Sequence, residues 1–189
     1  FENLQSEPRL HWLTEASADI LTDDLLALGV RAIRRDDRLR AFDRLRVPAV
    51  TSLSHATVIR LGQVVGAAEV VVGGFDVDAQ QQLTVRARAI RLDTGSMASE
   101  IVESGPLTDI FDVYARVARR LAPASTVTPE QMERGHPPIA ALEQYIKGLI
   151  AEAPETKVTF LGQALRIDPS LHRARIGGDG SRRALPRRA

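Results

Sequence analysis

The protein has 189 residues, of which 44% are hydrophobic and 26% charged, and its formal net charge is +1. This composition is typical of a soluble globular chain with room for one ordinary domain and a small addition, and it excludes a disordered protein. Cysteine is absent, which excludes disulfide scaffolds, thiolate metal sites and cysteine nucleophiles, and no apolar run approaches the ~18 residues that a membrane span needs.

The first third of the chain predicts mostly helices. Apolar residues recur there at three- and four-residue intervals, interrupted by one short apolar run. Gly29 stands where a helix C-cap belongs, and Asp36 or Asp37 can cap the next helix. The pattern predicts a helix over 12–28, a strand over 30–33, a helix ending near 45 and a helix over about 55–65.

The side-chain period then changes to that of a sheet. The run 70–72 predicts a strand covered on both faces, which Gly73 and Gly74 interrupt as a bulge. Strict alternation over 83–92, a turn at 93–95 and a returning strand near 101–102 predict a hairpin. A strongly periodic helix over 107–121 follows, with Thr108 or Asp109 as its cap and Arg116, Arg119 and Arg120 near the C-terminal end of its dipole.

The last third predicts a linker and a helical pair. The stretch 123–137 is rich in Pro, Ser and Thr and separates an α/β domain over 1–122 from a helical hairpin over 138–176. The two helices of this hairpin are predicted at about 139–151 and 155–167. Residues 177–189 have no apolar period, and we expect a disordered basic tail.

No motif predicts chemistry, so we expect no catalytic residue, cofactor or metal ligand. The arginines between Arg31 and Arg46 are interleaved with aspartates, so they indicate a solvated helix face and no nucleic-acid partner, although phosphate contact is the alternative. Glu15, Asp19 and Asp23 line one helical face, and they indicate a solvated outer face more than a cation site.

Four residues are candidates for binding a partner. Arg86 and Arg88 point together from one strand, where they either pair with a partner or merely keep that sheet face soluble. Tyr145 and Leu149 are the candidates in the helical hairpin.

Residues 1–122 resemble the TolB-like amino-terminal domain, to which the domain of the FlgO lipoprotein is related. The resemblance rests on "FENLQSEPRLHWLTEASADILTDDLLALGVRAIRRDD" leading to "LGQVVGAAEVVVGGFDVDAQQQLTVRARAIRLDTG". In that family an apolar strand precedes the "FENL" turn. The resemblance therefore implies that the first strand is missing here and that the exposed sheet edge favours self-association, and we expect any targeting signal or membrane anchor to lie upstream.

The stretch "ALEQYIKGLIAEAPETKVTFLGQALRIDPSLHRARI" resembles a tetratricopeptide repeat. Ala164 takes the place of the small residue that lets helices approach, and Pro169 ends the second helix. Because each repeat buries its apolar face on the next, the resemblance implies further repeats downstream.

These observations predict an α/β protein in which helices pack on a mixed sheet, followed by a tetratricopeptide-like helical hairpin. We expect a non-catalytic adaptor or sensory module that binds a protein or peptide. The alternative is a regulatory domain that binds a small ligand. The sequence does not choose between bacterial cytoplasm, periplasm and cell envelope.

Overall fold

The computed structural model describes residues 1–5, 7–47, 53–128, 131 and 135–171. The chain forms two compact units, Phe1–Arg134 and Gly135–Ala189. The expected tail, 177–189, lies outside the described residues. The expected domain boundaries at 122 and 138 remain predictions.

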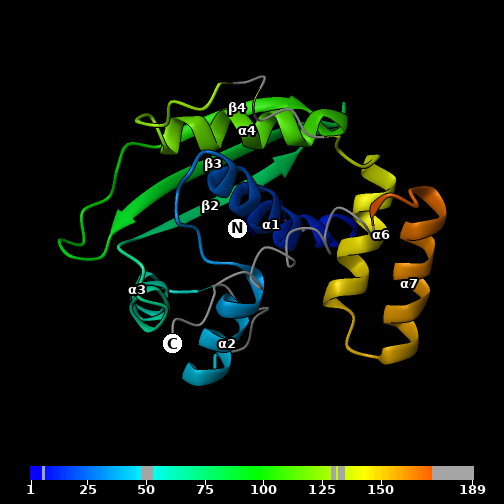
Figure 1. Ribbon diagram of the computed structural model, residues 1–189, viewed down its shortest axis with the longest axis horizontal. Helices are drawn as coiled ribbons and strands as arrows, with labels where there is room; N and C mark the ends of the chain where they lie inside the picture. Colours follow the sequence, from blue (N-terminus) through cyan, green and yellow to red (C-terminus); the bar gives the residue numbers. More distant parts are fainter. Residues whose placement is uncertain (6, 48–52, 129–130, 132–134, 172–189) are drawn as a thin grey trace, which may run out of the picture. The chain divides into compact units, whose positions relative to one another are not determined.

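The first unit is a mixed α/β structure built on a four-stranded sheet with the strand order β1-β2-β3-β4 (Figure 1). The short β1 (Glu2–Asn3) runs parallel to β2 (Glu69–Val77). The long β2 and β3 (Gln82–Arg91) are antiparallel, and β4 (Ile101–Pro106) pairs antiparallel with β3. The predicted hairpin of β3 and β4 is therefore confirmed, with Gly95 in the left-handed conformation of its turn (φ 68°).

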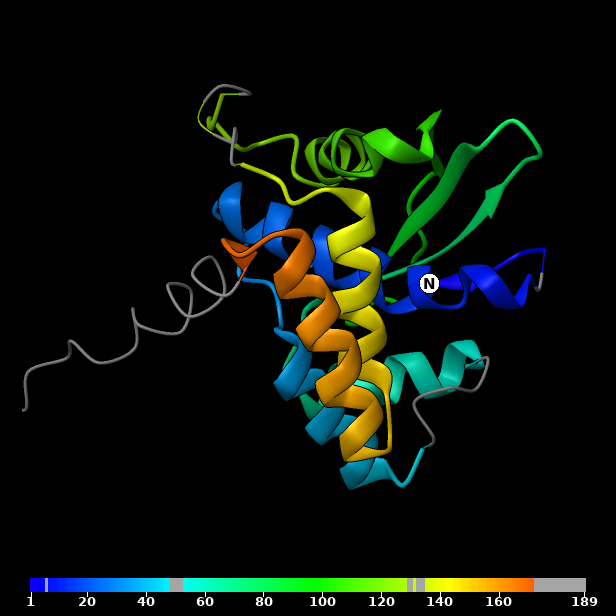
Figure 2. The same cartoon turned by 90° about the vertical axis from the view of Figure 1, so that its right-hand side faces the viewer.

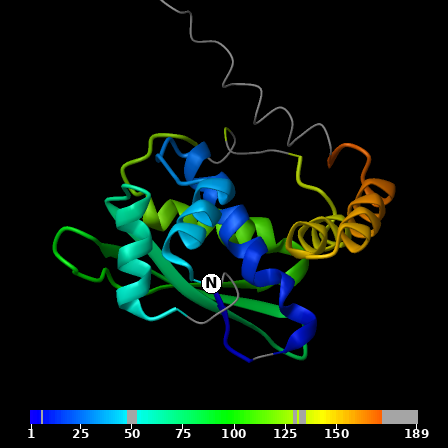
Figure 3. The ribbon, with the colours of Figure 1, turned by 90° about the horizontal axis from the view of Figure 1, so that it is seen from below.

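Two helices cover one face of this sheet, and a third covers only one end of the other face. Figure 3 shows that α1 and α4 lie along one face of the strands, and Gly105 of β4 packs so tightly on α4 that an added Cβ would lie 3.0 Å from Val113. At the start of β2, α3 covers the opposite face, because a Cβ on Gly62 would lie 2.8 Å from Val70. The helices are α1 (Trp12–Ala27), α2 (Arg35–Leu45), α3 (His55–Val64) and α4 (Ile110–Leu121), with short 3-10 turns η1 (Pro8–Leu10) and η2 (Leu107–Asp109).

The core of the first unit lies between the sheet and α1 with α4. Tyr114 is fully buried there, and its hydroxyl donates a hydrogen bond of 2.5 Å to Ser17 Oγ. Ser17 is also fully buried and donates to the carbonyl of Leu13 at 2.6 Å. The ring of Phe1 meets Tyr114 edge-on, with 5.9 Å between the ring centroids. Burial raises the pKa of the Tyr114 phenol above its ordinary value.

The acidic face of α1 is solvated, as predicted, at Asp23, whose side chain is 52% exposed, but it is not solvated at Glu15. Glu15 is only 19% exposed and accepts hydrogen bonds from Arg35, at 2.9 Å, and from Arg38. Asp23 forms an ion pair with Arg34, with 3.6 Å between Nη1 and Oδ1. Three arginines at the start of α2 therefore pair with two carboxylates of α1.

The predicted strand at 30–33 is also wrong. The N–H of Val30 donates to Leu25 at 2.9 Å, so the chain is still bonded to the end of α1, and Val30 is 38% exposed. No strand of the sheet lies beside this segment among the described residues. The next helix begins one residue before Asp36, and its N-cap Arg34 makes no side-chain capping bond.

The predicted bulge is absent from the described residues, whereas the predicted cap of α4 is at its expected position but makes no capping bond. β2 pairs with β3 without interruption through Gly73 and Gly74, and residues 70–72 are half-buried rather than covered on both faces. Glycine is required at Gly73 because a Cβ there would collide with the backbone oxygen of Arg86. Asp109 is the N-cap of α4 but forms no side-chain capping bond.

The strand that the resemblance places before the "FENL" turn would precede Phe1, so its absence stays a prediction, while the turn itself contributes the two residues of β1. Glu2 pairs with Gly74 and Asn3 with Phe75, and the N–H of Leu4 donates to Phe75 at 2.9 Å. This short strand covers part of the edge of β2. Self-association through that edge therefore remains a prediction.

The second unit is an antiparallel helical hairpin of α6 (Ile139–Ile150) and α7 (Pro154–Ile167), drawn in yellow and orange in Figure 2. The two helices approach closely, because a Cβ on Gly148 would lie 2.7 Å from the side chain of Leu161. Ala164 is fully buried, as the sequence predicted for a small residue at this position. The helical pair is confirmed, whereas its identity as a tetratricopeptide repeat is not shown.

Candidate interaction face

The sheet of the first unit has one covered face and one largely open face. Successive residues of a strand point to opposite faces, and on β3 the buried Leu83, Val85 and Ala87 point toward α1 and α4. Arg86 and Arg88 point the other way and are exposed. We use the term open face for this second surface, which includes Val72, Gly74 and Asp76 of β2, Thr84, Arg86 and Arg88 of β3, and Val102 and Ser104 of β4.

Two arginines on the open face share one carboxylate. Arg88 Nε donates to Glu100 Oε1 at 3.2 Å, and Arg86 Nη1 lies 3.8 Å from Glu100 Oε2. The three side chains are between 34% and 46% exposed. The single carboxylate of Glu100 neutralises only one of the two guanidinium charges, so this three-residue cluster keeps one excess positive charge at a solvent-accessible position.

A shallow hollow of about 270 Å³ lies beside these arginines. Leu4 lies over Gly74 and is 53% exposed, and Met97, which also lines the hollow, is 43% exposed. His55 and Val72 also line the hollow. Exposed apolar side chains next to arginine are the combination that protein interfaces favour, because arginine combines charge, hydrogen bonding and packing area.

A second hollow of about 270 Å³ lies between α2 and α3. Its apolar wall includes Ile33 and Val64, and Arg44 stands at its rim. Arg40 also lines it but is engaged with Asp37, at 2.6 Å. The hollow is of side-chain size, smaller than the ~300–1,000 Å³ usual for a small-molecule pocket.

The part of the chain that the structure describes holds no group of three or more side chains able to bind a metal ion. Within the same described ranges, no helix is long and apolar enough to cross a bilayer.

The structure brings only one pair of the predicted partner-binding residues onto the open face. Arg86 and Arg88 lie there side by side, as their spacing predicted. Tyr145 and Leu149 are half-buried residues of α6 in the other unit. Their role in binding remains a prediction.

Sequence reasoning missed three of the residues that line the hollow beside Arg86 and Arg88. Glu100, Met97 and Leu4 lie outside or at the ends of the regular strands, where no periodic pattern fixes which way a side chain points. One signal in the sequence could have indicated Glu100. It is the carboxylate directly before the returning strand, and opposite charges on neighbouring strands commonly pair.

No protein-family model and no curated protein matches the chain. Among solved structures, the LpoB C-terminal domain from Salmonella enterica aligns with a TM-score of 0.35 and 15% sequence identity. The alignment covers 39% of this chain and 55% of that domain's chain. A TM-score of this size does not identify a shared fold, so the likeness supports no statement about function.

Proposed function

We propose that this chain is a non-catalytic protein-interaction module, and that the open face is its docking surface. The observation that carries the proposal is the position of Arg86 and Arg88, which share Glu100 beside the exposed side chains of Leu4 and Met97. The expected adaptor role of TolB-like domains agrees with this proposal but does not test it.

The chemistry of the open face defines the kind of partner that fits. A partner carboxylate can replace or join Glu100 between the two guanidinium groups, because one carboxylate leaves them with an excess positive charge. Apolar side chains on the same partner segment would cover Leu4 and Met97. Burying such a side chain fully contributes about 1.5–3 kcal/mol, more than an exposed ion pair contributes. We therefore expect the apolar contact to supply affinity and the arginines to supply specificity.

A photo-crosslinking amino acid at Met97 tests this proposal in the native cell. We expect a discrete crosslinked product that is lost when Arg86 and Arg88 are both changed to glutamate. The matched control is Arg91→Glu, which changes an exposed arginine of the same strand that pairs with Asp93. A crosslinker at the exposed turn residue Gln80 is the control for nonspecific crosslinking to abundant proteins. Identical products from Met97 and Gln80, or products that survive the double charge reversal, would contradict the proposal.

The hollow between α2 and α3 supports the alternative of a regulatory ligand-binding domain. Its apolar wall and Arg44 would suit a small apolar anion. A saturable chemical-shift change at Ile33 and Val64 on addition of octanoate, lost in Arg44→Gln, would favour this alternative. We rank it second because the hollow is small and Arg40 is already held by Asp37.

A further inference from the structure

β4 is the last strand of the sheet, so one of its two edges has no strand beside it among the described residues. An edge strand presents unpaired N–H and C=O groups that can pair with a strand of another molecule. In an antiparallel pair, alternate residues point their backbone groups outward. The outward carbonyls at the edge of β4 include those of Val102 and Ser104, because both accept hydrogen bonds from outside the sheet.

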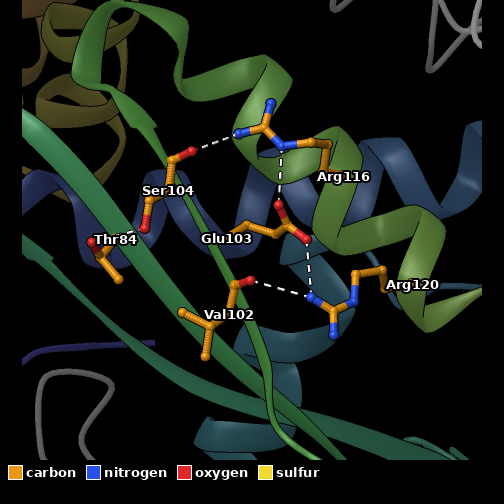
Figure 4. Close-up of polar contacts among 6 residues, drawn as sticks. All are labelled: Thr84, Val102, Glu103, Ser104, Arg116 and Arg120. Atoms are coloured by element: carbon orange, nitrogen blue, oxygen red, sulfur yellow. Dashed lines mark hydrogen bonds and ion pairs between the residues drawn. The ribbon is translucent and has the colours of Figure 1, made fainter.

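Those two carbonyls are occupied by arginines from α4 (Figure 4). Arg116 Nη2 donates to the oxygen of Ser104 at 2.8 Å, and Arg120 Nη1 donates to the oxygen of Val102 at 3.2 Å. The two arginines lie one helical turn apart, which matches the spacing of alternate carbonyls along a strand. They therefore take the positions that the N–H groups of an added strand would take.

Glu103 holds both arginines in place. Its Oε2 accepts from Arg116 Nε at 3.0 Å and its Oε1 accepts from Arg120 Nη1 at 3.0 Å. Glu103 is 18% exposed, whereas the arginines are 45% and 50% exposed. Long exposed side chains lose rotamer freedom when they are fixed, so a less exposed carboxylate between them is needed to keep both guanidinium groups on the strand.

We propose that the edge of β4 is a strand-docking surface for a second copy of this chain, and that the cluster of Glu103, Arg116 and Arg120 keeps it closed. We call this cluster the edge clamp. The native chain does not pair through this edge while the clamp is formed.

A second copy fits this edge because β4 is complementary to itself. In an antiparallel pair of two β4 strands centred on Glu103, Val102 of one copy lies opposite Ser104 of the other. The carbonyls that now accept from arginine would accept from the backbone N–H groups of the partner. The two Glu103 side chains would then face each other, and like charges placed directly opposite disfavour pairing. Glu103 therefore opposes this dimer in two ways.

Light scattering after size exclusion, over a hundred-fold range of protein concentration, tests the proposal. We expect the double variant Arg116→Ala with Arg120→Ala to dimerise at concentrations at least ten-fold lower than the native chain. The matched control is Arg86→Ala with Arg88→Ala, which frees a carboxylate on the same sheet but no backbone carbonyl. Glu103→Gln provides an independent variant with both arginines retained, and we expect it to dimerise as well. Unchanged fluorescence of Trp12 shows that the fold is kept.

A single engineered cysteine tests the register, since the native chain has none. We expect Glu103→Cys, placed in the double-alanine variant, to form a disulfide-linked dimer under mild oxidation. Thr84→Cys in the same background lies on the inner strand β3 and should not. Folded variants that stay as monomeric as the native chain would overturn the proposal. Equal crosslinking through Thr84, or dimerisation of the Arg86/Arg88 control to the same extent, would also overturn it.

Discussion

The hydrogen bonds of Tyr114 and Ser17 allow an uneven mutational effect to be predicted. Tyr114 donates to Ser17, and Ser17 donates onward to Leu13, so the serine hydroxyl is both acceptor and donor. Both side chains have no measurable exposure to solvent. Water therefore cannot replace a missing partner without a rearrangement of the core.

The two single substitutions should differ in their cost. Tyr114→Phe removes one donor and leaves Ser17 bonded to Leu13, so the loss is that of one ordinary hydrogen bond, about 1 kcal/mol. Ser17→Ala leaves the phenol of Tyr114 buried and without its acceptor, which adds a desolvation penalty and brings the cost to about 2–3 kcal/mol. Once Ser17 is alanine, removing the phenol hydroxyl also removes that penalty. The double variant should therefore be no less stable than Ser17→Ala alone.

Urea unfolding followed by tryptophan fluorescence measures these free energies. The chain has a single tryptophan, Trp12, which is 3% exposed and lies at the start of α1, the helix that also carries Ser17. Its fluorescence therefore reports the unfolding of the first unit and not that of the helical hairpin. The m-value should stay constant across the four proteins of the cycle.

The reasoning is refuted if Ser17→Ala costs no more than Tyr114→Phe, or if the double variant loses the sum of the two single losses. Either result would mean that the phenol of Tyr114 finds another partner in the core when Ser17 is removed.

Two further substitutions test the charge contact between α1 and α2 and the packing of the helical hairpin. Glu15→Gln should lower the free energy of unfolding by about 1–3 kcal/mol in the same fluorescence assay, because two arginines lose a half-buried carboxylate. The control Asp37→Asn, at an exposed ion pair, should lower it by less than about 0.5 kcal/mol. Equal losses in the two variants would contradict the docking of α2 through Glu15. Gly148→Ala should lower the stability of the helical hairpin, measured by hydrogen exchange, because its Cβ would lie 2.7 Å from Leu161. The control Gly162→Ala, whose Cβ would have its nearest neighbour at 3.9 Å, should raise the stability by up to about 1 kcal/mol through helix propensity. Protection from exchange that rises in both variants would show that Leu161 can move aside without a loss of stability.

Most elements were predictable because their side-chain period is local information. The helices α1, α4, α6 and α7 and the strand β3 each carry a long repeat of apolar residues, and the structure places all five close to their predicted limits. The segment 30–33 failed because four apolar-rich residues are compatible with several backbone conformations. Hydrogen bonds to the end of α1 decide its conformation, and sequence pattern does not contain them.

The pairing of charges was not predictable to the same degree. Glu15 looked like part of a solvated stripe because helical spacing shows which face a residue occupies, but not what covers that face. Arg116 and Arg120 suited the helix dipole, yet their main contacts are with the backbone of β4. Such contacts depend on how elements distant in sequence pack together. Arg86 and Arg88 were predictable as neighbours because strand alternation alone sets their direction.

The order of elements along the chain has a consequence for synthesis. Helix α1 buries Leu13 and Ile20 in a core that β2, β3, β4 and α4 complete only near Leu121. A ribosome releases α1 long before those strands have emerged, so the apolar side of this helix stays uncovered until the chain through Leu121 has been made. Until then, the growing chain exposes an amphipathic helix to which chaperones can bind. The parallel pairing of β1 with β2 also forms late, because it closes a loop that spans three helices.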